Sequence, residues 1–495
     1  MDKHKKVLFI VADSLMYQAV DEGIKRKELP ALQFLVEHGQ YYKDLVSAFP
    51  TMSVTIDSSL LTGTYPDEHG VPGLIWYCAE EQRIVNYGTG PMEILRQGID
   101  QVLIDAIRNL NGKHLNPSTA TIYEELAERG LKSGSVNGII YRGIASHTLS
   151  LPAYFSPLTS LPKEITVKGP DVLAFGALDS PFPEEKHLPD GLFRKLGFND
   201  QYAVETVAHL VKNGQLPDFL YVYLSDMDQH IHRKGPPDLK AVIKLDGHLN
   251  ALLEAFGSKE QALKQAVIMV TGDSGVSSIV PSHEDPVVQL PELLKPYHIL
   301  KPGAAVDRET EVVLAVNETM AYVYSLQEGA DRQLREMAEL LRAESRIDLV
   351  AWKEKEWVRV WKVGESGELR YRSNGKMTDL YDQSWEIEGN HKILDLSQDL
   401  NGRLQYGEYP DGLRRLWASL HSHKGNFIVV TAKPGYELAG HSSPAHRGGG
   451  GHGTFHRIES LIPLIICGTD AMPHRRRIVD LKSYLLQLLQ NGRTK

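Results

Sequence analysis

Residues 7–14 read Val-Leu-Phe-Ile-Val-Ala-Asp-Ser, a run of six apolar residues that ends at an acidic one. Such a short run, rich in β-branched residues, predicts a strand buried on both faces, as in parallel sheets. The preceding residues are basic, but the run is shorter than the apolar segment of a signal peptide, which needs about 7–15 residues. The stretch therefore predicts a central strand with an aspartate at its carboxyl end.

Further apolar runs alternate along the chain with helical patterns. The helical patterns cover Ala120–Arg129 and Leu239–Phe256. The other predicted strands are Phe219–Leu224, Val267–Thr271, Phe427–Thr431, Leu461–Cys467 and, with a weaker pattern, Gly134–Ile140. This alternation predicts an α/β fold with a doubly wound, mostly parallel sheet sandwiched by helices.

Three of these strands end at or beside an acidic residue, namely Asp13, Asp226 or Asp273. In open α/β sheets, ligands bind outside the carboxyl ends of the strands. A helix cap or a turn explains each aspartate taken singly. Three carboxylates at one edge would repel one another unless a cation lay between them. Together they indicate a metal site.

A segment rich in hydroxyl groups follows, Phe49-Pro50-Thr51-Met52-Ser53-Val54-Thr55. A proline just before a helical stretch, with hydroxyl groups around the first turn, predicts the start of a helix. The positive end of a helix suits a phosphate or an alkoxide nucleophile, which a metal can activate. Taken on its own, the segment is better explained by ordinary helix capping.

Histidines supply the remaining candidate ligands. Asp226 and His230 are four residues apart, and His452 lies in the glycine-rich run 448–453, shortly before a predicted strand. Carboxylate and imidazole groups are good zinc ligands. The alternatives are a polar surface loop for the first segment and a flexible linker for the second.

Taken together, these segments resemble the alkaline phosphatase superfamily, and most closely its nucleotide pyrophosphatase/phosphodiesterase branch. The most specific similarity is the nucleophile segment, Phe49–Ser53 through Leu61–Val71, and the other motifs follow in the family's order. The resemblance implies an alkaline-phosphatase-like core that hydrolyses phosphoric esters, either phosphodiesters or pyrophosphates, with monoesters as a further alternative, through a covalent phosphoserine or phosphothreonine intermediate. It also implies two divalent metal ions, zinc first, with manganese or magnesium as alternatives.

Carried over by position, the nucleophile is Ser53, where the family usually has threonine, and Thr51 is the second choice. One metal site would comprise Asp226, His230 and His452, and the other would comprise Asp13, Ser53 and Asp273.

The chain departs from the family pattern in three places. Ser274 replaces a histidine ligand, so the second metal site could be weak, hold a harder ion, use His283 instead, or be empty. Gln229 replaces a glycine, and the Gly235-Pro236 pair comes two residues late, which makes His232 an alternative to His230. Leu74 replaces an asparagine that binds substrate phosphate in relatives. These departures leave open a degenerate member that binds a metal or a phosphorylated ligand without turnover.

The stretch from about residue 287 to residue 420 has a different, mixed pattern. It predicts a smaller α+β cap, inserted into a core of residues 1–286 and 421–495.

Composition limits the possible partners. The net charge of −9, from 54 basic and 63 acidic residues, and the lack of a basic block exclude a binder of duplex nucleic acid. The expected partner is a small phosphate ester. No apolar stretch approaches the ~20 residues of a membrane span. The two cysteines, Cys78 and Cys467, form no CxxC pair, which fits a reducing compartment. We expect a soluble, cytoplasmic protein, and the sequence does not determine its oligomeric state.

Overall fold

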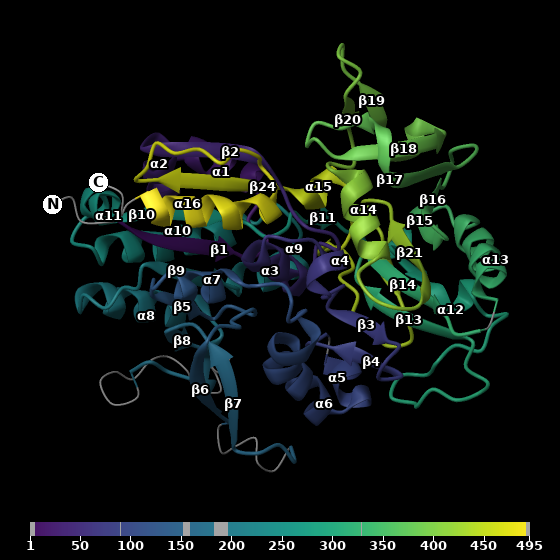
Figure 1. The fold of residues 1–495 in the computed structure, drawn as a ribbon, viewed down its shortest axis with the longest axis horizontal. Helices are drawn as coiled ribbons and strands as arrows, with labels where there is room; N and C mark the ends of the chain where they lie inside the picture. The colour runs from purple at the N-terminus through teal and green to yellow at the C-terminus, as the bar shows by residue number, and fades with distance from the viewer. Residues whose placement is uncertain (1–4, 90, 152–158, 183–196, 328, 492–495) are drawn as a thin grey trace.

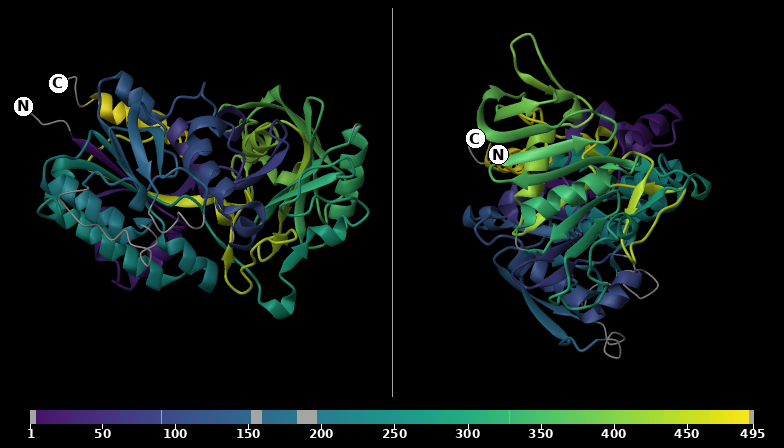
Figure 2. Two further views of the ribbon diagram at one scale, coloured as in Figure 1. Left: turned by 90° about the horizontal axis from the view of Figure 1, so that it is seen from below. Right: turned by 90° about the vertical axis from the view of Figure 1, so that its right-hand side faces the viewer.

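The computed structural model describes residues 5–89, 91–151, 159–182, 197–327 and 329–491. Two seven-stranded sheets organise these residues, and each forms one lobe of the molecule (Figures 1 and 2).

The first sheet is mostly parallel, as the sequence predicts. Its strands β10, β1, β9, β5 and β8 run parallel. At one edge β24 pairs antiparallel with β10, and β2 pairs antiparallel with β24, so only β24 of these strands runs in the opposite direction. In spatial order the strands are β2 (Gly39–Val46), β24 (Leu461–Cys467), β10 (Ala266–Thr271), β1 (Lys6–Ala12), β9 (Phe219–Leu224), β5 (Ser133–Val136) and β8 (Val172–Ala174).

Helices cover both faces of this sheet, and the side chains of β1 show how. Val7, Phe9 and Val11 belong to the core under α3 (Ser53–Thr62), α7 (Ile122–Glu128) and α16 (Leu481–Asn491). The alternate residues Leu8, Ile10 and Ala12 face the opposite helices, which are α1 (Tyr17–Lys25), α2 (Pro30–Glu37), α8 (Asp200–Lys212) and α10 (Leu239–Glu254). Because both faces are covered, β1 is a continuous apolar run rather than an alternating one.

The second sheet is antiparallel throughout. Helix α13 (Ala330–Arg342) packs on one of its faces and α14 (Gly412–Leu420) on the other. Its spatial order is β13 (Val312–Asn317), β14 (Met320–Ser325), β21 (Asn426–Ala432), β15 (Ile347–Glu354), β16 (Trp357–Lys362), β17 (Leu369–Thr378) and β18 (Ser384–Gly389).

One strand lies in a different sheet from the one the sequence indicates. The prediction that Phe427–Thr431 belongs to the parallel sheet is wrong, because β21 pairs with β14 and β15 in the second sheet. Residues 427–432 are buried on both faces, so this strand has the same apolar pattern as a parallel strand. The division into a core and a cap of residues 287–420 stays a prediction, and β21 extends the second sheet beyond residue 420.

Smaller elements complete the fold. Strands pair in twos as β3 (Ile75–Cys78) with β4 (Arg83–Asn86), β6 (Ala145–Ser150) with β7 (Glu164–Gly169), β11 (Ser277–Ser278) with β23 (Gly450–Gly451), β12 (Val287–Gln289) with β22 (Glu437–Ala439), and β19 (Leu396–Gln398) with β20 (Leu404–Tyr406). The remaining α-helices are α4 (Pro66–His69), α5 (Pro91–Gln97), α6 (Ile99–Ile104), α9 (Asp226–Lys234), α11 (Lys259–Gln265), α12 (Leu290–Leu293) and α15 (Arg457–Ser460). The π-helix η1 (Asp105–His114) continues α6, and the 3-10 helices are η3 (Gly176–Leu178), η5 (Ser282–Glu284), η6 (His391–Leu394) and η7 (Ile478–Asp480). None of the helices in the described ranges combines the length and apolar composition needed to cross a bilayer.

Candidate active site

A cluster of carboxylate and imidazole groups lies at the carboxyl edge of the parallel sheet. Helix α9 begins just after β9 and presents Asp228 and His232 one turn apart. The ligand atoms of Asp228, His232 and His452 all lie within 4.8 Å of one another. Asp228 Oδ1 is 3.0 Å from His232 Nε2 and 3.6 Å from His452 Nε2. These three side chains have the chemistry of a zinc site.

Backbone carbonyls fix the orientation of both histidines. His232 Nδ1 is 2.8 Å from the carbonyl oxygen of Gly450, and His452 Nδ1 is 2.6 Å from that of Thr51. When Nδ1–H donates to these carbonyls, each Nε2 lone pair faces Asp228. Metal-binding histidines are oriented in this way by the groups behind them.

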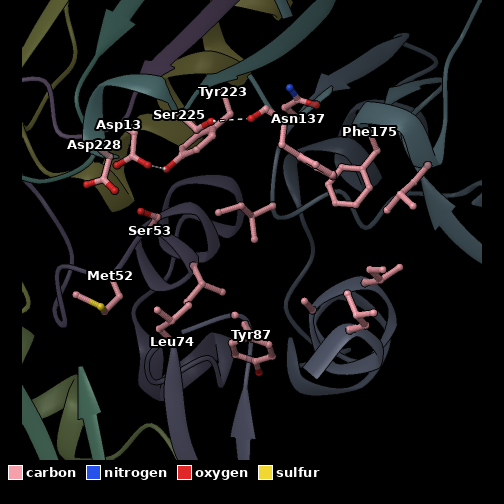
Figure 3. Close-up of a pocket in the computed structure, with 18 of the residues that line it drawn as sticks. Asp13, Met52, Ser53, Leu74, Tyr87, Asn137, Phe175, Tyr223, Ser225 and Asp228 are labelled. Carbon is pink, nitrogen blue, oxygen red and sulfur yellow. Dashed lines mark hydrogen bonds between the residues drawn. The ribbon is translucent and has the colours of Figure 1, made fainter. Parts of the chain in front are cut away.

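Two further aspartates lie beside this cluster, at the ends of β1 and β10. Asp13 is buried, and its Oδ2 accepts a 2.6 Å hydrogen bond from Tyr223 Oη (Figure 3). Within the described residues, Asp13 Oδ1 is buried without a hydrogen-bond partner. Asp273 Oδ1 accepts from the backbone N–H groups of Ser14 and Ser274, at 2.8 and 2.7 Å. Burial, together with the charges of Asp273 and Asp228, raises the pKa of Asp13 well above its ordinary value. A bound cation would relieve this repulsion.

Ser53 lies at the same end of the cavity as Asp13 and Asp228 (Figure 3). It is the first residue of α3, no side chain caps this helix end, and Ser53 lines the same cavity as Asp13 and Asp228 (Figure 3). Backbone N–H groups at an uncapped first turn can bind an anion. The hydroxyl of Thr51 has a different role, because it donates to the Thr454 carbonyl at 3.0 Å and accepts from Gly453 N–H at 2.8 Å.

The second sheet contributes an acidic side chain that the sequence reasoning missed. Glu318 lies at the turn between β13 and β14, where its φ of 56° is left-handed. Its Oε1 is 3.7 Å from His232 Nε2, and its Oε2 accepts a 3.2 Å hydrogen bond from the backbone N–H of His452. His232, Glu318 and His446 form a second group whose ligand atoms lie within 4.8 Å. Only long-range contacts bring Glu318 here, so no local pattern signals it.

These charges control the protonation of the two histidines. Burial opposes the charged form of His232, but the carboxylates of Glu318 and Asp228 outweigh it and raise its pKa to about 10. For His452, burial likewise opposes charging, and Glu318 and Asp228 raise its pKa to about 9. A metal ion would take the place of these protons, so its binding depends on pH.

The sequence profile of the type I phosphodiesterase / nucleotide pyrophosphatase family matches residues 7–455. The chain belongs to this family. Membership confirms the resemblance seen in the sequence, and it identifies the chain as a hydrolase that acts on phosphoric esters. No curated protein sequence matches the chain significantly.

Solved structures of other proteins share the fold of this chain. One is an inactive variant of murine ectonucleotide pyrophosphatase / phosphodiesterase 5 in complex with AMP, with a TM-score of 0.57 and 14% identity over 98% of this chain and 95% of that one. Another is phosphonoacetate hydrolase from Sinorhizobium meliloti 1021 in complex with phosphonoformate, with a TM-score of 0.55 and 16% identity over 99% and 96%. At these identities the likeness shows the fold alone, and it confirms the predicted fold class.

In this phosphodiesterase-family chain, the expected ligands Asp226 and His230 do not lie with His452. They are two residues from Asp228 and His232, which is about 200° around a helix, so they lie on the opposite face of α9. Asp226 pairs with Lys244 Nζ at 2.8 Å, and His230 is exposed. The late Gly235-Pro236 pair was the sequence signal for this shift.

The structure also places the residues at which the chain departs from the phosphodiesterase family. Ser274 Oγ is buried without a hydrogen-bond partner among the described residues. His283 is exposed and lies near Glu284, outside both groups of potential ligands. Leu74 lines the cavity beside Ser53.

The donor groups fit divalent metal ions. Asp228, His232 and His452 offer a carboxylate and two oriented imidazoles, which suits zinc. Asp13 has one buried oxygen without a partner within the described part of the chain, and Asp273 lies close enough to raise its pKa. Because Ser274 supplies no imidazole, this second set is oxygen-rich and suits a harder ion.

Proposed function

We propose that this chain hydrolyses phosphoric diesters or pyrophosphates, with Ser53 as the nucleophile and two divalent metal ions, zinc first. The observation that carries the proposal is Ser53 at the uncapped start of α3, in one cavity with Asp13, Asp228, His232 and His452. The names of the fold relatives add support, since AMP and phosphonoformate are both small anions with a phosphorus centre.

In the proposed ligand sets, Asp228 and His232 take the places of Asp226 and His230, which the sequence had suggested. Asp228, His232 and His452 would hold one ion, and Asp13, Asp273 and Ser53 would hold the other. The metal ions would lower the pKa of the nucleophile and neutralise charge on the phosphoryl oxygens.

The reaction would proceed in two balanced steps. In the first, Ser53 Oγ loses its proton and bonds to phosphorus while the bond from phosphorus to the leaving alkoxide breaks, and the alcohol leaves with a proton. In the second, water attacks phosphorus, the bond to Ser53 Oγ breaks, and the serine regains its proton. Backbone N–H groups at the first turn of α3 would bind the phosphoryl oxygens in both steps.

Aryl phosphates test this proposal. We expect chelated enzyme supplemented with Zn²⁺, Mn²⁺ or Mg²⁺ to hydrolyse bis-p-nitrophenyl phosphate faster than p-nitrophenyl phosphate. Ser53→Ala should lower kcat by about 10⁴-fold or more, as loss of a catalytic serine does elsewhere. The matched control is Ser282→Ala, because Ser282 is an exposed serine in η5.

Two results would contradict the proposal. Full activity of Ser53→Ala would remove Ser53 from the mechanism. Purified protein without metal or turnover under any of these conditions would favour a degenerate member that only binds a ligand, an alternative motivated by Ser274 in place of a histidine ligand.

The cytoplasmic location stays a prediction. Cys78 and Cys467 are both buried thiols without a disulfide, which agrees with a reducing compartment.

A further inference from the structure

The cavity that contains Ser53 is polar at one end and apolar over the rest of its wall. It has a volume of about 460 Å³. Ser53, Asp13 and Asp228 gather at the polar end, and Phe175 lies at the other (Figure 3). We call the remainder the apolar cavity, and its wall includes Leu74, Leu103, Ile107, Phe175, Leu178 and Phe198.

The wall of the apolar cavity is well packed. Ile107, Phe175 and Leu178 are buried in one hydrophobic cluster, and Leu103 and Phe198 pack against it. The rings of Phe175 and Phe198 meet edge to face at 4.8 Å between centroids. The cavity is therefore formed by fixed side chains rather than by a loose surface.

Polar side chains in this wall already have hydrogen-bond partners within the protein. Asn137 donates through Nδ2 to the Gly197 carbonyl at 2.9 Å and accepts from Gly176 N–H at 3.2 Å. The hydroxyl of Tyr87 is hydrogen-bonded to His114 Nδ1 at 2.8 Å. No lysine or arginine is among the described residues that line the cavity. A nucleoside would bury its base and ribose here without hydrogen-bond partners, which is costly.

A second space opens on the other side of the cluster. This polar groove, of about 540 Å³, shares Met52, Leu74, Asp228, His232 and Glu318 with the cavity that contains Ser53. Its remaining wall combines polar side chains, such as Thr89, Gln229, Arg233 and Ser443, with the apolar side chains of Val316 and Pro444. The two spaces meet at the candidate metal ligands. The two ester groups of a phosphodiester bound there would therefore extend in different directions, one into the apolar cavity and one into the polar groove.

We propose that the substrate is a phosphodiester with one apolar ester group, an alkyl chain or an aryl ring, that occupies the apolar cavity. The other ester group is polar and lies in the polar groove. This inference rests on the proposed function and narrows its substrate class. It also accounts for Leu74, an apolar residue that lines the same cavity as the nucleophile.

The length of an alkyl chain provides the test. Each buried methylene contributes about 0.8 kcal/mol, which is about fourfold in Kd. For ethyl-, butyl-, hexyl- and octylphosphonate titrated into the metal-loaded enzyme by calorimetry, we expect Kd to fall about fourfold per methylene until the cavity is full. AMP should bind more weakly than octylphosphonate.

A pair of leucine variants locates the effect. Leu103 is half-buried in the cavity wall, and Leu95 is an exposed leucine on α5, 67% accessible. Leu103→Gln should raise the Kd of octylphosphonate about tenfold and leave the Kd of ethylphosphonate unchanged, whereas Leu95→Gln should change neither Kd. Thermal unfolding of both variants checks that they are folded.

The outcomes separate this inference from the function on which it rests. Metal-dependent binding with the same Kd at every chain length, or tighter binding of AMP, would overturn the apolar subsite and leave the hydrolase proposal intact. An equal effect of Leu95→Gln would also overturn the subsite. If no phosphonate binds with or without metal and no aryl phosphate is hydrolysed, the proposed function fails, and the subsite with it.

Discussion

Ser53 and Thr51 are two residues apart, yet their hydroxyl groups have different surroundings. Thr51 is fully buried, and its Oγ1 joins the start of α3 to the loop that carries His452. In that loop, Gly453 has a φ of 145°, and a Cβ there would lie 2.4 Å from the Asn317 carbonyl oxygen. Thr51 therefore has a positioning role in the structure, whereas Ser53 lines the cavity that contains Asp13 and Asp228.

Substitution of Thr51 should therefore lower the free energy of unfolding more than it lowers the rate of hydrolysis. Thr51→Val keeps the shape but leaves a buried carbonyl and a buried N–H without partners, which costs about 1–3 kcal/mol. We expect a lower free energy of unfolding in urea and hydrolysis within about tenfold of the wild type. Thr51→Ser restores the hydroxyl and should recover most of the stability. If Thr51→Val stayed fully stable but lost all turnover, Thr51 would be the nucleophile.

His69 is a buried histidine in the nucleophile segment, and its neighbours select the neutral form. Its Nδ1 accepts from the backbone N–H of Val71 at 3.1 Å, so Nε2 carries the proton and donates to Ser59 Oγ at 3.0 Å. Burial lowers the pKa of His69 to about 3. The unfolded chain has a value near 6.5. Between these values the unfolded state binds the proton and the folded state does not.

The sign of the pH effect follows from this difference. The stability contributed by neutral His69 is complete above pH 6.5 and is lost as the pH falls toward 3. We expect His69→Gln to lower Tm at pH 7 but to lose less Tm than the wild type between pH 7 and pH 5. His283→Gln, at an exposed histidine, should keep the wild-type slope. Equal slopes for wild type and His69→Gln would show that His69 does not contribute.

At the scale of one element, the register of α9 decides which side chains can bind metal. Asp228 and His232 point to His452, while Asp226 and His230 are on the other face of the helix. We expect Asp228→Asn and His232→Gln to lose about one metal equivalent after dialysis, measured by elemental analysis. Asp226→Asn and His230→Gln make the same chemical changes on the opposite face and should retain it. Loss of metal from the second pair alone would reverse the assignment.

This register marks the limit of prediction from sequence for the site. The position after β9, the residue types and the four-residue spacing are all local, and the sequence predicted them. Two Asp-x-x-x-His pairs overlap in Asp226–His232, however; the late Gly235-Pro236 pair made His232 an alternative, and the packing of α9 shows that Asp228 and His232 face the cavity. Glu318 could not be predicted, because it arrives through contacts between the two sheets.

The same distinction applies to the strands of the fold. The run before Asp13 predicted a strand with two covered faces, and β1 has this environment. For β21, the pattern of buried residues predicted a strand but could not choose its sheet, since the second sheet is also covered by helices on both faces. Strand type is a local property, and strand partners depend on the whole chain.

Across the whole molecule, the candidate metal site joins the two sheets. Asp228 and His232 follow the parallel sheet, Glu318 comes from the turn between two strands of the antiparallel sheet, and His452 follows β23. Burial raises the pKa of Glu318, but the positive charges of His232, His452 and His446 outweigh burial and lower it. A cation bound there would therefore hold together groups from both lobes.

Chelation should accordingly destabilise the whole protein rather than one loop. A ligand that binds only the folded state and is present at 100 times its Kd contributes about 2.7 kcal/mol, so EDTA should lower Tm by several degrees and excess Zn²⁺ should restore it.

Glu318→Gln removes a negative charge next to the ligands, and we expect about tenfold weaker zinc binding in competition with a chelator. Glu309→Gln, on the exposed loop before β13, serves as the matched control. Because tenfold in Kd is about 1.4 kcal/mol, the Tm difference between loaded and chelated protein should shrink in Glu318→Gln and stay unchanged in the control. If the difference were the same in both variants, Glu318 would not act on the metal, and the link between the sheets would depend on packing alone.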